Sequence, residues 1–285
     1  MKISVGMGFR DKKEAFQNIK TAMCESGLTF ELYYGTSVVK IIDQDGVITR
    51  WGSIPDKKGM FLPQITNKIV NKRIASGEYV PVNTDSKRYT NNTIMYSNRN
   101  ITRNFKNLCV AVDITACYWQ SAFNLGVIDE KTYKLGMSKD REYKIARNVA
   151  IGSIGAMIFH QKYENGKLVF SEITRRPGAC ARLDIIDHVW QVALRISEKL
   201  GKDFLMYLTD CFYVPATRID DLCKYIEDEG YKWKLHQVGF EKIERMSTGN
   251  DRSNNKIYTE KVIWYDFEKK KYTFHDFSHK HNFIF

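Results

Sequence analysis

Two runs of apolar residues stand out along the chain, and each contains a single carboxylate. Residues 108–119 read LCVAVDITACYW and hold Asp113, whereas residues 204–215 read FLMYLTDCFYVP and hold Asp210. Short apolar runs rich in Val, Ile, Phe and Tyr are typical of buried β-strands. An ionised Asp in such a strand is costly unless it is paired or binds a cation. The two runs therefore predict acid-bearing strands that share a metal ion; the alternative is that each Asp caps a turn at a strand end.

The rest of the pattern predicts helices and strands arranged around these two runs. Helices are predicted over residues 12–26, 129–148, 184–200 and 219–229. Strands are predicted over 29–34, 37–43, 47–51, 156–163, 167–173, 232–238, 240–246, 256–264 and 271–274. Asp45-Gly46 and Asn165-Gly166 are typical hairpin turns. No element is predicted over the polar residues 52–107. The order predicts an α+β fold: a split β-α-β antiparallel sheet with helices on one face, preceded by a small α/β segment.

The composition is that of a globular protein, with 285 residues, 43% hydrophobic content and 13% aromatic residues. No apolar stretch approaches the ~20 residues of a membrane span, and the N-terminus has no signal-peptide core. We therefore expect a cytoplasmic protein with no membrane partner, in the host cytoplasm if the chain is viral. The six cysteines form no CxxC pair, which favours reduced core thiols over disulfides or a zinc site.

The formal net charge of +11 is concentrated in one part of the chain. Residues 56–107 hold ten Lys or Arg and three acids, with Tyr79, Tyr89 and Tyr96 between the cations. Basic side chains attract phosphate, and interleaved aromatic rings suit stacking on bases. The alternative is an ordinary solvated basic face. The basic residues that we expect to contact nucleic acid are Lys87, Arg88, Arg99 and Arg103.

Three segments resemble the palm domain of family B DNA polymerases, and most closely its protein-primed branch. The first motif of that family reads D-x-x-S-L-Y-P, the second K-x-x-x-N-S-x-Y-G and the third Y-x-D-T-D-S. The matching positions here are Asp113 and Tyr118 in the first, Lys144, Asn148 and Gly152 in the second, and Thr209 and Asp210 in the third. Each motif alone is weak, but the three occur in the family's order and cover roughly residues 105–230.

The resemblance implies a palm-like sheet and a metal-dependent nucleotidyltransferase. Asp113 and Asp210 would be the catalytic residues and the ligands of Mg²⁺ or Mn²⁺. Joining a nucleotide to a 3′-hydroxyl fits this pair, since two divalent cations about 4 Å apart activate the attacking oxygen and stabilise the leaving pyrophosphate. Residues 1–105 would form an N-terminal α/β segment and basic arm. Residues 106–285 would form the palm-like domain, with very short fingers at about 126–155.

The same resemblance assigns the substrate-binding residues. Lys144 would pair with the triphosphate, assisted by Arg141 or Arg147, and Asn148 belongs to the same motif. Tyr118 would pack under the sugar, although an aromatic residue beside a strand is also ordinary core. Lys256 and Tyr258 match the K-x-Y element that contacts the primer terminus; the alternative is a strand of alternating polarity.

Several positions depart from the family. Leu208 replaces the first acid of the third motif, Trp119 replaces the usual Pro, and Val149 and Ile151 replace the Ser and Tyr of the second motif. The chain shows no exonuclease signature and leaves little length for a thumb. We therefore expect a separate exonuclease, thumb or priming protein as a partner.

Three functions remain open from the sequence. The first is a minimal polymerase-like enzyme, from a phage or mobile element, that adds deoxynucleoside triphosphates to a DNA primer annealed to a template. The second is a catalytically inactive palm-like protein that binds nucleic acid or assembles a replisome, which Leu208 favours. The third is a nuclease in which Glu172 or Asp184 joins Asp113 and Asp210 at the metal.

Overall fold

The computed structural model describes residues 9–34, 38–46, 48–52, 61–84, 95–97, 108–250, 256–266, 269–279 and 282–283. The chain forms two compact units, and each unit is made of two segments. The first unit combines Met1–Ser86 with Val127–Leu183, and the second combines Lys87–Gly126 with Asp184–Phe285. The expected contiguous division at residues 105 and 106 differs from this one, because the chain leaves the second unit after Gly126 and returns at Asp184.

The first unit contains an antiparallel sheet of five strands in the order β3-β2-β1-β6-β7. Its strands are β1 (Phe30–Tyr34), β2 (Val38–Asp43), β3 (Ile48–Gly52), β6 (Met157–Glu164) and β7 (Lys167–Arg175). Helix α1 (Phe9–Glu25) packs on one face, where Ile19 and Met23 contact buried Phe30 and Leu32. The hairpin β6–β7 has the predicted boundaries within about two residues. The hairpin was expected in the palm-like domain, whereas here β6 pairs with β1 in the first unit.

Three helices complete the first unit: α2 (Leu62–Ala75), α4 (Glu130–Gly136) and α5 (Arg141–Ile154). Helix α2 lies in the stretch for which no element was predicted. Pro63 stands in its first turn, where proline is well tolerated, and Leu62, Thr66 and Val70 form its buried face. The predicted helix over 129–148 is two helices, since Asp129 caps α4 by accepting a 2.7 Å hydrogen bond from the Thr132 N–H and α5 starts anew at Arg141.

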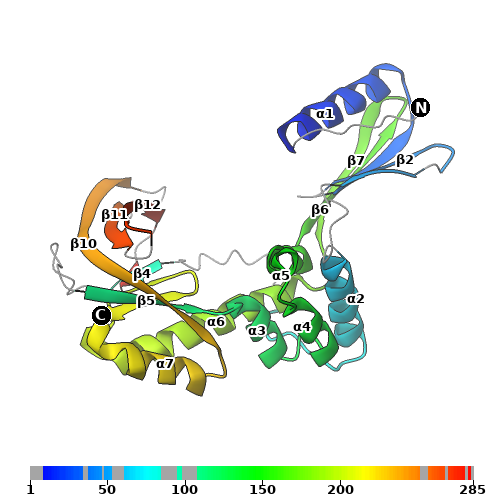
Figure 1. Cartoon of the computed structure of the whole chain (residues 1–285). Coiled ribbons are helices and arrows are strands. Elements are labelled where there is room, and N and C mark those ends of the chain that lie inside the picture. Colours follow the sequence, from blue (N-terminus) through cyan, green and yellow to red (C-terminus); the bar gives the residue numbers. More distant parts are fainter. Residues whose placement is uncertain are drawn as a thin grey trace. The chain divides into compact units, whose positions relative to one another are not determined.

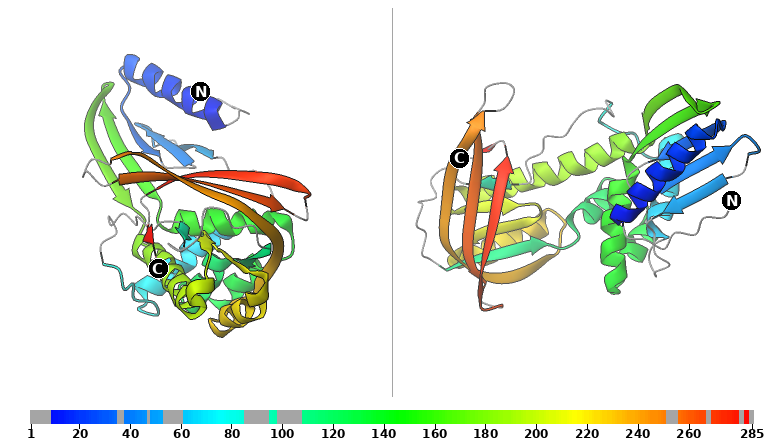
Figure 2. Two further views of the ribbon diagram at one scale, coloured as in Figure 1. Left: turned by 90° about the vertical axis from the view of Figure 1, so that its left-hand side faces the viewer. Right: turned by 90° about the horizontal axis from the view of Figure 1, so that it is seen from above.

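The second unit contains a sheet of eight strands in the order β12-β11-β10-β5-β9-β8-β4-β13, in which only the β13–β4 pair is parallel. Its strands are β4 (Met95–Ser97), β5 (Leu108–Ile114), β8 (Met206–Leu208), β9 (Cys211–Pro215), β10 (Trp233–Asn250), β11 (Lys256–Asp266), β12 (Lys271–His279) and β13 (Asn282–Phe283). The strands predicted over 232–238 and 240–246 form one continuous β10, with an irregularity in its pairing to β11 between Phe240 and Lys242. Figure 2 shows β10 bent along its length, as an irregular pairing permits.

Helices cover one face of this second sheet, as predicted. They are α3 (Cys117–Asn124), α6 (Ala179–Leu200) and α7 (Ile219–Asp228), with short 3₁₀ turns η1 (Gly201–Asp203) and η2 (Ala216–Arg218). Val112 and Ile114 of β5 and Phe212 and Val214 of β9 are at most 1% exposed and pack against α6 and α7 (Figure 1). The α+β fold predicted from the sequence is therefore confirmed. Among the described residues, none of the helices combines the length and apolar composition needed to cross a membrane.

Candidate active site

Asp113 lies near the end of β5, the strand between β9 and β10. Its neighbours Val112 and Ile114 point into the core beneath the sheet. Side chains alternate along a strand, so Asp113 points to the opposite face, which α6 and α7 leave uncovered. The side chain is half-buried. A carboxylate therefore lies near the end of an apolar strand, as the sequence predicted.

Asp210 lies at the bend between β8 and β9, next to the end of β5. The N–H of Ile114 donates to the backbone carbonyl of Asp210 at 2.7 Å. Asp113 is paired in register with Cys211, the residue that follows Asp210. The bond from Ile114 makes residues 114 and 210 a hydrogen-bonded pair, so Asp113 and Cys211 form the closer, non-hydrogen-bonded pair. The two acid-bearing segments are therefore adjacent, which the sequence alone could only suggest.

Two thiols, the buried Cys117 and the half-buried Cys211, lie close enough to both acids for the acids to affect their pKa. Burial, followed by the nearby Asp113 and Asp210 carboxylates, raises the pKa of the Cys211 thiol. Burial and then Asp210 and Asp113 raise the pKa of Cys117 well above its usual value. In the metal-free chain both thiols are therefore favoured in the protonated form. The two acids offer carboxylate oxygens, which are the kind of ligand preferred by Mg²⁺ and Mn²⁺.

The structure also pairs a lysine with Asp113 across the sheet. Lys234 of β10 is its antiparallel partner on the side opposite β9. Leu235 packs against the core and Trp233 Nε1 donates to Glu227 Oε1 of α7 at 2.9 Å, so both neighbours of Lys234 point to the helix-covered face. Lys234 therefore points to the same face as Asp113, and it is exposed. Sequence reasoning missed this residue, because only the pairing of β10 with β5 brings the two together.

Left-handed backbone occurs beside both acids. Ala116, three residues after Asp113, has φ +52°, and Thr209, immediately before Asp210, has φ +60°. A β-branched residue rarely adopts this conformation, which costs about 1–2 kcal/mol per residue. Such residues persist where the surrounding structure imposes them, and they concentrate at functional sites. At Thr209 the carbonyl accepts a 2.6 Å hydrogen bond from the Tyr207 hydroxyl, which holds the bend.

Replacing Thr209 with glycine is expected to stabilise the chain by roughly 0.5–1 kcal/mol, because glycine adopts a positive φ freely and loses only part of this gain to backbone entropy. Urea unfolding would measure the change. Thr217 is the matched control: it is exposed and lies in η2 without a positive φ, so Thr217→Gly should destabilise the chain. Equal destabilisation by both variants would show that the bend stores no strain.

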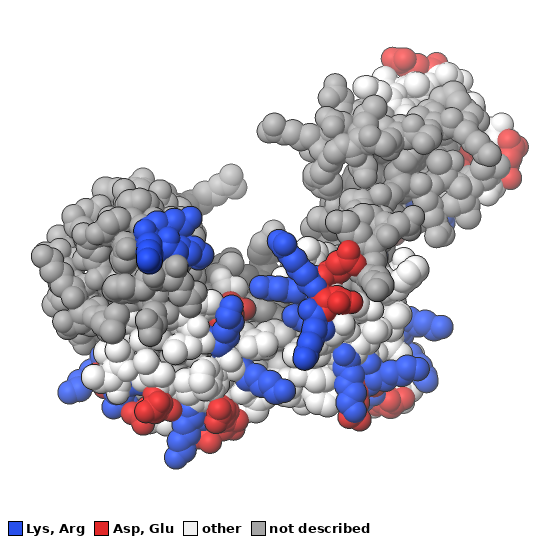
Figure 3. All heavy atoms as spheres, viewed as in Figure 1, with Lys and Arg blue, Asp and Glu red and all other residues white. Residues whose placement is uncertain are grey.

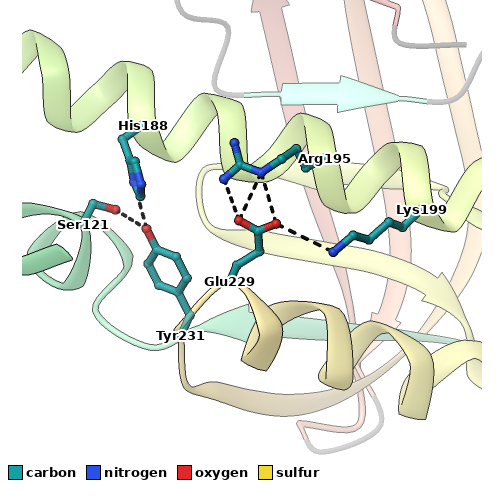
Figure 4. Close-up of polar contacts among 6 residues, drawn as sticks. All are labelled: Ser121, His188, Arg195, Lys199, Glu229 and Tyr231. Carbon is teal, nitrogen blue, oxygen red and sulfur yellow. Dashed lines mark hydrogen bonds and ion pairs between the residues drawn. The ribbon is translucent and has the colours of Figure 1, made fainter. Parts of the chain in front are cut away.

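A network of polar side chains braces the helix that follows Asp113 (Figure 4). The buried hydroxyl of Ser121 in α3 donates to the carbonyl of Cys117 at 2.9 Å and lies 2.6 Å from the Tyr231 hydroxyl. Because Ser121 has already used its hydrogen, Tyr231 donates to it, and Nδ1–H of His188 in α6 donates to Tyr231 at 3.2 Å. These contacts join α3 and α6 to Tyr231, just before β10. They therefore fix the helix that follows Asp113 relative to the start of the strand that carries Lys234.

An ion pair reinforces the same corner. Arg195 of α6 donates to both carboxylate oxygens of Glu229, with a shortest distance of 2.6 Å, and Lys199 lies 3.8 Å away (Figure 4). Hydrogen bonds from Arg195 hold the pKa of Glu229 below its usual value, against the opposing effect of burial. The pair ties α6 to the residue after α7, which supports the helix layer under the sheet.

Stability is expected to depend on the protonation of His188. Burial and the nearby Arg195 lower the pKa of His188 from 6.5, with a smaller opposing effect of Glu229. A lowered histidine pKa gives stability that is complete above pH 6.5 and is lost as the pH falls through the folded-state value. The free energy of unfolding of wild type should therefore fall between pH 7 and pH 5, and that of His188→Gln should fall less. Identical slopes in the two proteins would contradict this assignment.

Helix α5 carries the residues expected to bind the nucleotide. Arg141, Lys144 and Asn148 are all exposed and recur at intervals of three and four, so they form one stripe opposite the buried Ala146 and Ala150. Figure 3 shows Lys and Arg side chains gathered over α5. Lys144 and the acid pair belong to different compact units.

Two other expected nucleotide-site residues have structural contacts. Arg147 is half-buried and donates to the carbonyl of Gly136 at 2.5 Å, so it holds the last turn of α4 rather than a free position on the stripe. Tyr118 lies in α3, partly buried against the core cluster beneath the sheet. Tyr118 is therefore in part a core residue, which was the alternative expected for it, and its contact with a sugar stays a prediction.

The expected nucleic-acid contacts are placed only in part. Lys256 and Tyr258 lie in β11, in register with Asn250 and Ser247 of β10. Four of the expected basic contacts lie outside the described residues: Lys87, Arg88, Arg99 and Arg103.

Of the acids considered for a nuclease, Glu172 is exposed on β7 in the first unit, whereas Asp184 is 6% exposed on α6 in the second.

Asp113 and Asp210 are residues of the kind that binds a divalent cation, but they are too few to hold two cations. In the part of the chain that the structure describes, no three His, Cys, Asp or Glu side chains gather as a metal-binding group. Asp113 and Asp210 supply two carboxylates, and Leu208 stands where the polymerase motif has a further acid. A single Mg²⁺ or Mn²⁺ that keeps several waters is compatible with so few protein ligands.

No protein-family model and no curated protein sequence matches the chain.

Proposed function

We propose that this chain is a minimal metal-dependent nucleotidyltransferase, similar to a reduced family B polymerase palm, that adds deoxynucleotides to a DNA primer. The observation that carries the proposal is the acid pair. Asp113 ends a central strand and Asp210 occupies the bend of the neighbouring hairpin, on a sheet whose other face is covered by helices. Carboxylates from two adjacent strands are the arrangement that binds cations for phosphoryl transfer.

The chain's own residues have distinct tasks in this proposal. Asp113 and Asp210 would hold the divalent cation, which supplies charge neutralisation and activation of the primer hydroxyl when bound. Lys144 and Arg141 on the exposed stripe of α5 would bind the triphosphate by charge-assisted hydrogen bonds. The network of Ser121, Tyr231 and His188 would keep the acid-bearing segment in position, because preorganised charge is what makes such a site effective.

The order of segments also supports the proposal. Residues 127–183 leave the second unit between the two acid-bearing strands and belong to the first unit. They contain α5 with Lys144 and Asn148. In the polymerase family that the chain resembles, the fingers are inserted between the first and third motifs in the same way. The expected partners remain DNA, deoxynucleoside triphosphates and a separate exonuclease, thumb or priming protein in the cytoplasm.

A catalytically inactive palm-like protein that binds nucleic acid is the second candidate. Leu208 favours it, because this residue pairs with Cys211 at the site and supplies no ligand. The buried network around Tyr231 would serve either candidate. The two differ in whether the acid pair is used, since binding of DNA alone does not require half-buried acidic residues on two neighbouring segments.

The experiment that separates the two candidates is extension of a labelled primer by the full chain. The primer is offered alone and annealed to a longer template, with Mg²⁺ or Mn²⁺. The proposal predicts incorporation with at least one of the metals, and the two substrates show whether a template is used. Binding of the DNA without any incorporation would favour the inactive protein.

A further inference from the structure

We propose that the acid pair binds one divalent cation rather than two, and that the ammonium group of Lys234 provides the second positive charge beside Asp113. This inference rests on the proposed function, because it concerns the same site. It starts from the mismatch between the number of acids here and the number in the polymerase motifs.

The number of carboxylates limits how many cations the site holds. Two divalent cations about 4 Å apart repel each other strongly, and bridging carboxylates offset that repulsion. Here Leu208 stands in place of one acid, and among the described residues no third His, Cys, Asp or Glu side chain joins a metal-binding group. Two carboxylates with two divalent cations would leave two net positive charges at the site. Three carboxylates with two cations leave one, as do two carboxylates with one cation and a lysine.

The position of Lys234 follows from the pairing of β10 with β5. The N–H of Thr115 donates to the carbonyl of Lys232 at 2.8 Å, so residues 115 and 232 are a hydrogen-bonded pair. Two residues along, Asp113 and Lys234 are then also such a pair, with Cα atoms about 5.5 Å apart and side chains on the same face. Cys211 lies on the other side of Asp113. Asp113 thus lies between Cys211 on β9 and Lys234 on β10, with all three side chains on the same face of the sheet.

The surroundings keep the lysine at this position. Trp233 and Leu235, on either side of it, are anchored on the helix-covered face by Glu227 and by the core. The backbone of β10 is therefore fixed at Lys234, while its exposed side chain has a flexible four-carbon stem on the same face as Asp113. A lysine ammonium at this position would supply a positive charge without a second metal ion, which would itself need further protein ligands.

The test is a titration of the full chain with Mn²⁺, in which electron paramagnetic resonance measures the concentration of the free ion. Wild type should bind one Mn²⁺ that is lost in the double variant Asp113→Asn/Asp210→Asn. Lys234→Met should bind this ion roughly three- to tenfold more tightly, because a neighbouring positive charge has been removed. Lys234→Arg should keep the wild-type affinity, and Lys224→Met, at an exposed position on α7, should not change it.

Primer extension provides the second readout. Lys234→Met should lose incorporation at saturating metal although it binds Mn²⁺ more tightly, and a merely structural lysine would not produce opposite changes. Two acid-dependent Mn²⁺ ions in wild type, or equal affinities in Lys234→Met and Lys224→Met, would overturn the inference. Either result leaves the proposed function intact if the chain extends a primer. If wild type binds one Mn²⁺ whose affinity depends on Lys234 but incorporates no nucleotide, only the proposed function is overturned.

Discussion

Asparagine at Asp113 or at Asp210 is expected to lower primer extension by roughly 10²- to 10³-fold, which corresponds to about 3–4 kcal/mol of lost transition-state stabilisation. The two acidic residues lie on neighbouring segments at the end of β5, where the Ile114 N–H donates to the Asp210 backbone carbonyl. Asparagine keeps the size of the side chain but not its charge, so the cation is bound weakly. Single-turnover extension with saturating nucleotide would measure the loss in the chemical step.

The control for these variants is Asp228→Asn, which changes an exposed carboxylate at the end of α7 in the same unit. It alters net charge by the same amount and should extend primers as wild type does. Circular dichroism and urea unfolding would confirm that all three variants fold. An Asp113→Asn or Asp210→Asn variant that folds and retains wild-type extension would contradict the assignment of that residue as a metal ligand.

Alanine at Lys144 is expected to lower incorporation at low nucleotide concentration by roughly 10- to 100-fold. A hydrogen bond to a charged group contributes about 1.5–3 kcal/mol, and a triphosphate would accept such bonds from the exposed stripe of α5. The measurement is the dependence of the extension rate on nucleotide concentration. The effect should appear mainly in KM if the lysine binds the triphosphate in the ground state.

The matched control is Lys139→Ala, an exposed lysine of the same unit that lies just before α5. Both variants remove one positive charge, so a general electrostatic effect on DNA binding would lower activity equally in the two. Equal KM values for nucleotide in Lys144→Ala and wild type would remove Lys144 from the site. The position of α5 would then be explained by its packing against α2, where Asn67 donates to Ser153 at 2.6 Å.

Local pattern predicted most of the elements because their causes are local. The apolar face and glycine stop of α6 and the turn residues of the hairpin β6–β7 act within a few positions. Helix α2 was missed because its Lys and Asn residues mask a short apolar face, although Pro63 at its start is a typical signal. The pairing of β1 with β6 was missed because it joins residues more than a hundred positions apart.

The candidate site was predictable in its acids and not in its environment. Asp113 and Asp210 stand out because each is the only charge in an apolar run. Lys234 gives no such signal, since it lies in a polar stretch and meets Asp113 only through strand pairing. The same holds for His188 and Tyr231, which lie 43 positions apart in sequence and meet through the packing of α6. Long-range pairing decides these contacts, and composition does not report it.

The most direct test of the central claim is whether the wild-type chain joins a labelled deoxynucleotide to a primer 3′ end at the acid pair. Purified wild type and the Asp113→Asn/Asp210→Asn double variant would be incubated with primer–template, Mn²⁺ and one labelled triphosphate, and the labelled primer and released pyrophosphate quantified. We expect equal amounts of extended primer and pyrophosphate from wild type and neither from the double variant. Incorporation that persists in the double variant, or its absence from a wild-type chain that binds the same DNA, would contradict the claim.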